Sequence, residues 1–202
     1  MIKRISTLII LSCGLYGCSI FSPVETNMIQ QYQFGHQVIA PDNQCSSPQY
    51  PYTIQVNRTT AFSPYDSYKM FYAMSSYQIN SYSYSQWAAL PQSVINQLIQ
   101  RKLIQSCLFS NVIHANFITT ADIRLNTQLI ELQLEVDKSS SIVHLIIFAQ
   151  LINAKSNDII KHKTFIMQTP VETSPKGFAI GADKDTTEFL NQLSDWLREI
   201  KS

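Results

Sequence analysis

Three extended segments in the second half of the chain constrain its fold more than any other feature. Apolar side chains alternate along residues 121–136 and switch from odd to even positions midway: Ile123, Leu125 and Leu129, then Ile130, Leu132, Leu134 and Val136. Because neighbouring side chains on a strand point to opposite faces, this switch predicts a β-bulge near Leu129 and Ile130. Residues 141–153 and 159–168 also have strand patterns, and a polar turn separates them. The three segments therefore predict an antiparallel meander.

The middle segment of this meander is apolar on both faces, apart from His144 and Gln150. Two arrangements fit this pattern. The strand is either central and covered on both sides, or its second face is buried against another copy of the chain in a homo-oligomer.

Helical periodicity predicts two amphipathic helices. Residues 90–109 place five apolar side chains on one stripe: Val94, Ile95, Leu98, Ile99 and Leu103. Residues 175–201 place eight on one arc: Phe178, Ala182, Phe189, Leu190, Leu193, Trp196, Leu197 and Ile200. The polar face of this last helix carries both positive and negative charges, which favours packing on a sheet over lying on a membrane. The expected fold is α+β: a single domain with a mainly antiparallel sheet, on which the middle helix and the C-terminal helix pack.

The first half of the chain contains a tyrosine-rich hairpin. Residues 31–40 and 52–57 are predicted strands, with a loop at 41–51 between them, and the hairpin that comes after them turns at Ser75 and Ser76. Alternating tyrosines either form a binding face or are the solvated side of a sheet whose other side is core. If they bind, the candidate partner interface consists of Tyr77, Tyr82, Tyr84 and Trp87.

The N-terminus has the pattern of an export signal. Lys3 and Arg4 precede an apolar run that is too short to span a membrane and that ends in Leu15-Tyr16-Gly17-Cys18. This ending resembles the lipobox of bacterial lipoproteins, in which the cysteine thiol receives a diacylglyceryl group before cleavage. Cys13 ends a competing box but leaves a shorter apolar core, so Cys18 is the expected lipidation site. We expect a signal peptide at 1–17, a lipidated N-terminus and tether at 18–30, and the domain at 31–202.

The charge balance and the cysteines of the chain indicate which partners and which cross-links to expect. The chain has 15 Lys and Arg against 14 Asp and Glu, so no electrostatic case exists for nucleic acid as a partner. Cys45 and Cys107 remain after Cys18, and an exported protein meets an oxidising compartment. The two cysteines are therefore either a disulfide, worth about 4 kcal/mol in the chain-entropy model, or two buried thiols.

Catalytic motifs are missing from the sequence. It contains neither a phosphate-binding loop nor a G-x-S-x-G elbow, and His36, His114, His144 and His162 lack metal-ligand spacing. No Asp and Glu pair stands out as a general acid and base. We therefore expect no enzyme activity, no cofactor and no metal site, and His144 to be a core or interface residue.

The order of these segments resembles the ABC-type transport auxiliary lipoprotein component family. The lipobox is followed by an aromatic hairpin, a Trp-Ala segment before a helix, an Ala-Asp-x-x-Leu strand and a final helix that ends in Trp-Leu. The matching positions are Tyr84, Trp87, Ala88, Leu90, Leu98, Phe109, Val112, Ala121, Asp122, Leu125, Ala182, Leu193, Trp196 and Leu197. Gly181-Ala182-Asp183 and Thr186 depart from the family, which more often has further alanines there.

This resemblance implies a non-enzymatic subunit of an envelope transport system. Its implied partners are an MCE-domain protein and an ABC permease, which move lipids or other hydrophobic molecules between inner and outer membranes. Ser19, rather than Asp, follows Cys18, which favours the outer membrane with the domain facing the periplasm. The alternative is a structural or regulatory outer-membrane lipoprotein that binds a cell-wall synthase or a secretion machine.

Overall fold

The computed structural model describes residues 27–36, 47–75, 77–116, 120–137 and 140–200. The predicted signal peptide, most of the tether, and Cys13, Cys18 and Cys45 lie outside these residues. The described chain forms one nine-stranded sheet with two helices, α2 and α3, which confirms the predicted α+β class.

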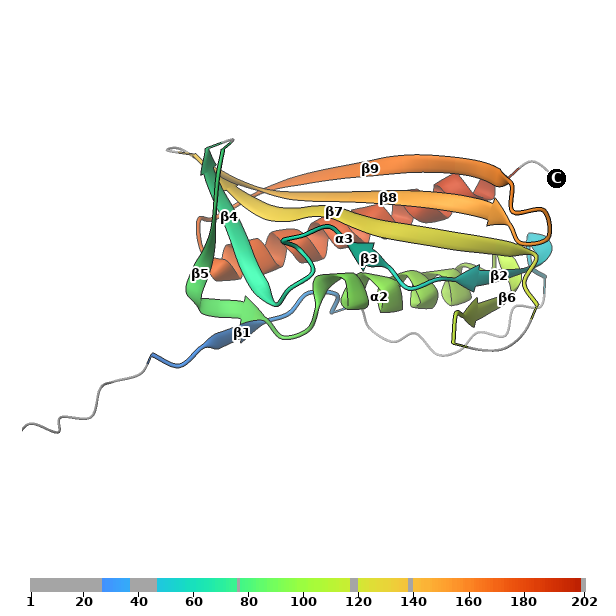
Figure 1. The fold of residues 1–202 in the computed structure, drawn as a ribbon, viewed down its shortest axis with the longest axis horizontal. Coiled ribbons are helices and arrows are strands. Elements are labelled where there is room, and N and C mark those ends of the chain that lie inside the picture. Colours follow the sequence, from blue (N-terminus) through green and yellow to red (C-terminus); the bar gives the residue numbers. More distant parts are fainter. Residues whose placement is uncertain (1–26, 37–46, 76, 117–119, 138–139, 201–202) are drawn as a thin grey trace, which may run out of the picture.

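The predicted meander is the longest part of the sheet. It consists of β7 (Ile123–Val136), β8 (Ser141–Asn153) and β9 (Ile159–Val171), which pair antiparallel and lie side by side in Figure 1. The register of β7 against β8 shifts between Leu129 and Glu131, which confirms the predicted bulge. The bounds of β8 are those expected from the sequence.

The strands of the first half are shorter and pair mostly in parallel, which the sequence did not predict. They are β1 (Gln30–Tyr32), β2 (Tyr50–Val56), β3 (Thr60–Ala61), β4 (Lys69–Ser75), β5 (Gln78–Trp87) and β6 (Phe109–His114). β2, β3 and β4 each run parallel to β7, β6 runs parallel to β2, and β1 runs parallel to β5. Among these six described strands, only β4 and β5 form an antiparallel pair, which confirms the predicted hairpin. The sheet is therefore mixed, with its longest pairings antiparallel.

The first strand ends earlier than predicted. Of the predicted strand 31–40, residues 37–40 lie outside the described residues; within 31–36, β1 stops at Tyr32 and the chain turns at Gly35, whose φ is +82°. A side chain there would be strained, and its Cβ would lie 2.7 Å from Leu98 Cδ1. The Gly35 N–H donates to Asp183 Oδ1 at 2.6 Å, which ties this turn to α3.

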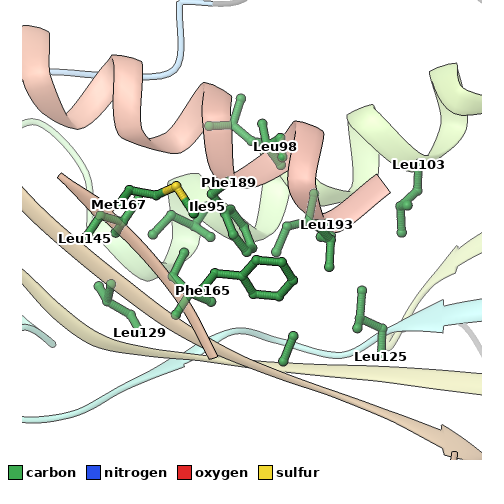
Figure 2. Packing of buried hydrophobic residues seen from close by; sticks show 14 of the residues in the cluster. Ile95, Leu98, Leu103, Leu125, Leu129, Leu145, Phe165, Met167, Phe189 and Leu193 are labelled. Carbon is green, nitrogen blue, oxygen red and sulfur yellow. The ribbon is translucent and has the colours of Figure 1, made fainter. Parts of the chain in front are cut away.

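Both helices pack on the same face of the sheet (Figures 1 and 2). α2 (Pro91–Ser106) buries Ile95, Leu98, Ile99 and Leu103 of the predicted stripe. α3 (Pro175–Arg198) begins at Ser174, whose side chain accepts a hydrogen bond from the Gly177 N–H and so caps the helix. All eight apolar residues predicted for its arc are buried.

The hydrophobic core lies between these helices and the meander. Figure 2 shows Leu98 and Leu103 of α2, Phe189 and Leu193 of α3, and Leu145 and Phe165 of the sheet in one cluster. The helix-facing side chains of β8 are at most 1% exposed: Val143, Leu145, Ile147, Ala149 and Leu151. The opposite side of β7, β8 and β9, which we call the outer face, is only half-buried on β8.

Candidate functional site: the hairpin and the outer face

The four residues of the predicted partner interface separate in the structure. Tyr77 is 101% exposed at the hairpin turn, and Tyr84 is 54% exposed. Tyr82 is half-buried, with its ring centroid 4.9 Å from that of Tyr72. Trp87 is 1% exposed and has edge contacts with Phe34 at 5.2 Å and Phe178 at 5.0 Å. Trp87 therefore belongs to the core rather than to an accessible surface, and Tyr77 and Tyr84 offer most of the predicted contact area.

Two exposed apolar residues of the hairpin were not singled out from the sequence. Met74 is 65% exposed and Ile79 is 44% exposed. β4 pairs with β7 only from Phe71 to Ala73, so the end of the hairpin extends beyond that pairing. The alternating pattern contains Met74, but it does not reveal where the underlying sheet stops.

A cleft of about 440 Å³ lies between the hairpin and β7. It is lined by Tyr65, Ala73, Ser75, Tyr77, Gln78, Ile79, Gln133 and Glu135. The Tyr65 hydroxyl donates to Gln133 Oε1 at 2.9 Å. Burial, assisted by the negative charge of Glu131, raises the pKa of Tyr65 to about 12, so this phenol stays a neutral donor.

Polar groups beside this cleft form a small network on the outer face. His144 Nε2 lies 2.9 Å from Glu135 Oε2, and Gln168 Nε2 lies 3.3 Å from His144 Nδ1. The two ring nitrogens of His144 thus face Glu135 and Gln168, one on each side. Burial raises the pKa of Glu131, and Glu135 adds to this, while His144 and a hydrogen bond with Gln133 oppose it. His144 therefore lies at the outer face rather than in the core, and its role at an interface stays a prediction.

The outer face also carries an apolar stripe. Ile142, Ile146 and Phe148 of β8 are half-buried there, and Ile166 of β9, which pairs with Ile146, is 60% exposed. Among the described elements, those that chiefly pack against β8 are β7, β9 and α3. One face of β8 is thus buried in the core, while the side chains of its second face are partly exposed.

The described residues contain no group of three or more His, Cys, Asp and Glu side chains that could hold a metal ion. No helix within the described ranges is long and apolar enough to cross a membrane.

The predicted cysteine chemistry stays a prediction. Cys107 follows the last turn of α2 and has a left-handed backbone, with φ of 52°. Cys45 and the lipidation candidates lie outside the described residues, so the Cys45–Cys107 disulfide and the modification of Cys18 await thiol counting and mass spectrometry.

Comparison with known proteins connects the chain to others by fold. No protein-family model matches the chain, and no curated protein matches it in sequence. A solved structure from Xanthomonas campestris, described as a member of the DUF330 family, is similar with a TM-score of 0.72 and 17% identity. The match covers 83% of this chain and 93% of that one.

Two further structures are less similar. One is described as an uncharacterized protein; it has a TM-score of 0.55 and 12% identity, and the match covers 82% of this chain and 99% of that one. The other is a lipoprotein from Neisseria meningitidis, with a TM-score of 0.44, 11% identity and coverage of 72% and 99%. At these identities the first two matches establish a shared fold and no shared function, and the third protein is too dissimilar to establish either.

Proposed function

We propose that this protein is a non-enzymatic lipoprotein subunit of an envelope transport system of the ABC and MCE type. Cys18 carries the lipid, the outer membrane holds it, and the domain faces the periplasm. The partners are an MCE-domain protein and an ABC permease, and the cargo is a lipid or another hydrophobic molecule.

The observation that carries this proposal is the order of the family-like segments along one continuous domain. A lipobox precedes the hairpin that ends at Trp87, and α2, the Ala121-Asp122 start of β7, and α3 with Trp196-Leu197 come after it in that order. The shared fold with a DUF330 protein over 83% of the chain supports treating these segments as one unit.

A lipid anchor and a weak protein contact are enough for this role. Two or three acyl chains attach a protein to a bilayer far more stably than one chain does. Tethering then raises the effective concentration of the domain at its partner, so a modest interface suffices. The apolar stripe of Ile142, Ile146, Phe148 and Ile166 is the surface we assign to the transport partner or to a second copy of the chain, and the hairpin tyrosines are a second contact surface.

Mass spectrometry of the mature N-terminal peptide tests the anchor. We expect a lipidated Cys18, and a lipidated Cys13 or an unmodified terminus would contradict it.

Photo-crosslinking from position 166 in whole cells tests the identity of the partner. Capture of an MCE-domain protein or a permease supports the proposal, whereas capture of a cell-wall synthase or a secretion protein would replace it with the alternative role. Lys176, exposed on α3, is a suitable control position because it lies on the opposite side of the sheet.

A further inference from the structure

We propose that the hairpin end of the domain rests directly on the lipid bilayer that holds the anchor. The contact surface, here called the hairpin patch, consists of Met28, Ile29, Met74, Tyr77, Ile79 and Tyr84. This inference rests on the lipid anchor at Cys18 from the proposed function. It adds an orientation: one end of the domain faces the membrane, and the apolar stripe of the outer face stays open to a protein partner.

The first supporting observation is an absence of charge in the sequence of β1 and of the hairpin from Met70 onwards, although Glu135 of β7 lines the cleft beside Tyr77 and Ile79. From Met70 to Gln100 the chain contains no Asp, Glu, Lys, Arg or His, and neither do residues 27–35. Charged residues make up 14% of the whole chain, so such a long neutral stretch is unusual for it. A charge costs free energy when it approaches the hydrocarbon of a bilayer, so a surface that lies on lipid has reason to lack charges.

The second observation is the type of side chain that this neutral region exposes. Tyr77 is 101% exposed and Tyr84 is 54% exposed, while Met28, Met74, Ile29 and Ile79 range from 44% to 88%. Tyrosine places an apolar ring and a polar hydroxyl at the level of the lipid headgroups, and the aliphatic residues bury more deeply. The remaining residues of β5 are mostly Ser, Asn and Gln, which remain hydrated beside headgroups.

The third observation is the position of β1 beside the hairpin. Gln30 of β1 pairs with Ser85 of β5, which places Ile29 and Met28 beside Tyr84. Figure 1 shows β1 and the hairpin at the same end of the molecule, away from the β8–β9 turn. The residues between Cys18 and Asn27 span at most roughly 30 Å when fully extended. A lipid on Cys18 therefore keeps this end of the domain close to the bilayer surface.

The opposite end of the domain lacks this combination among its described residues. Ile159 and Ile160, two exposed apolar residues at that end, lie between Asp158 and Lys161 in the sequence, and Ile104 near the end of α2 comes soon after Arg101 and Lys102. Exposed apolar residues at that end thus occur among charges, as is ordinary for a solvated surface.

Tryptophan fluorescence in vesicles tests this orientation. The full lipidated protein, purified from bacterial membranes, is reconstituted into phosphatidylcholine vesicles with or without brominated acyl chains. The probe is Tyr77→Trp, and the matched control is Ile159→Trp, which places the same exposed indole at the far end. Trp87 and Trp196 are buried and give a constant background, measured on the unaltered protein. We expect brominated lipid to lower the fluorescence of the tryptophan introduced at position 77 by roughly two-fold. The fluorescence of the tryptophan introduced at position 159 should stay unchanged.

Negative charges introduced into the hairpin patch provide the second variant. Adding Ile79→Asp and Tyr84→Asp to Tyr77→Trp should abolish the quenching, with circular dichroism confirming that the domain is folded. If the protein is bound to the vesicles and bromine quenches Tyr77→Trp and Ile159→Trp equally, the inference is overturned. The hairpin would then be a surface for a protein partner. Protein that fails to float with the vesicles would instead contradict the lipid anchor, so the two failures are distinguishable.

Discussion

The two faces of the meander are made from the same three strands but have different surroundings. The helix face holds Leu145, Ile147 and Phe165, each at most 1% exposed beneath α2 and α3. The outer face holds Ile146, Phe148 and Ile166, which are partly or largely accessible. Along β8 apolar side chains occur on both faces, so the composition of this strand alone does not separate a core face from a contact face. What separates them is whether another element of the chain covers the side chains.

Adjacent residues of β9 provide the largest expected difference between the faces. Phe165 is 1% exposed, and its ring meets Phe189 at 5.2 Å and Trp196 at 6.0 Å. Phe165→Ala should lower the free energy of unfolding by about 3–5 kcal/mol, because it removes apolar contacts and leaves a cavity. Ile166→Thr, one residue further on the outer face, should change it by less than about 0.5 kcal/mol.

Urea denaturation of both variants measures this difference. If Ile166→Thr destabilised the isolated monomer as much as Phe165→Ala does, the outer face would be part of the monomer core. If Ile166→Thr reduced crosslinking to a partner while stability stayed constant, the outer face would be confirmed as a contact surface.

A buried carboxyl on the helix face gives the next largest effect. Asp185 of α3 is 2% exposed, and its Oδ1 accepts a hydrogen bond from the Thr169 hydroxyl at 2.5 Å. Burial raises its pKa from 3.8 to about 6, although Thr169 and His144 oppose the shift. Because the folded pKa exceeds the unfolded one, the carboxyl favours folding fully below pH 3.8, and this advantage is lost as pH rises through 6.

Asp185→Asn should therefore stabilise the protein at pH 8 by about 2–3 kcal/mol and have little effect near pH 4. The amide keeps an acceptor for Thr169 and removes the buried charge. Denaturation midpoints of both proteins across this pH range measure the difference. A difference that does not vary with pH would mean that Asp185 is ionised at no cost in the folded protein.

The smallest expected effect concerns the cleft on the outer face. Tyr65→Phe removes the hydrogen bond to Gln133 and should cost about 1 kcal/mol, since the amide oxygen loses its donor in a partly buried site. Tyr77→Phe removes a hydroxyl that is fully exposed and should leave stability unchanged. Equal effects in thermal denaturation would show that the Tyr65 bond contributes nothing beyond what water supplies.

Local patterns predicted the meander and both helices, because each of those elements buries one whole face. The bulge near Leu129, the bounds of β8 and the buried arc of α3 all result from side-chain periodicity. The parallel pairing of β2, β3 and β4 with β7 could not be predicted in this way. Periodicity records which residues are buried and does not record which strand lies next to which.

The contact surfaces were predicted less completely than the fold. A tyrosine in a strand has the same local pattern whether it is exposed like Tyr77 or packed like Tyr82. Trp87 looked like a binding residue because it comes directly after the tyrosines, yet Phe34 and Phe178 approach it from segments distant in sequence. Such long-range contacts decide exposure, and they are set by the topology.

The connection between β1 and α3 has a mechanical consequence. Phe34 packs against Trp87, and the Gly35 and His36 N–H groups both donate to Asp183 Oδ1, at 2.6 Å and 3.2 Å. A force applied to the chain ahead of Gln30 acts first on β1, a three-residue strand at the edge of the sheet. If that strand came away from β5, the contacts of Phe34, Gly35 and His36 would still hold the chain to the core and to α3.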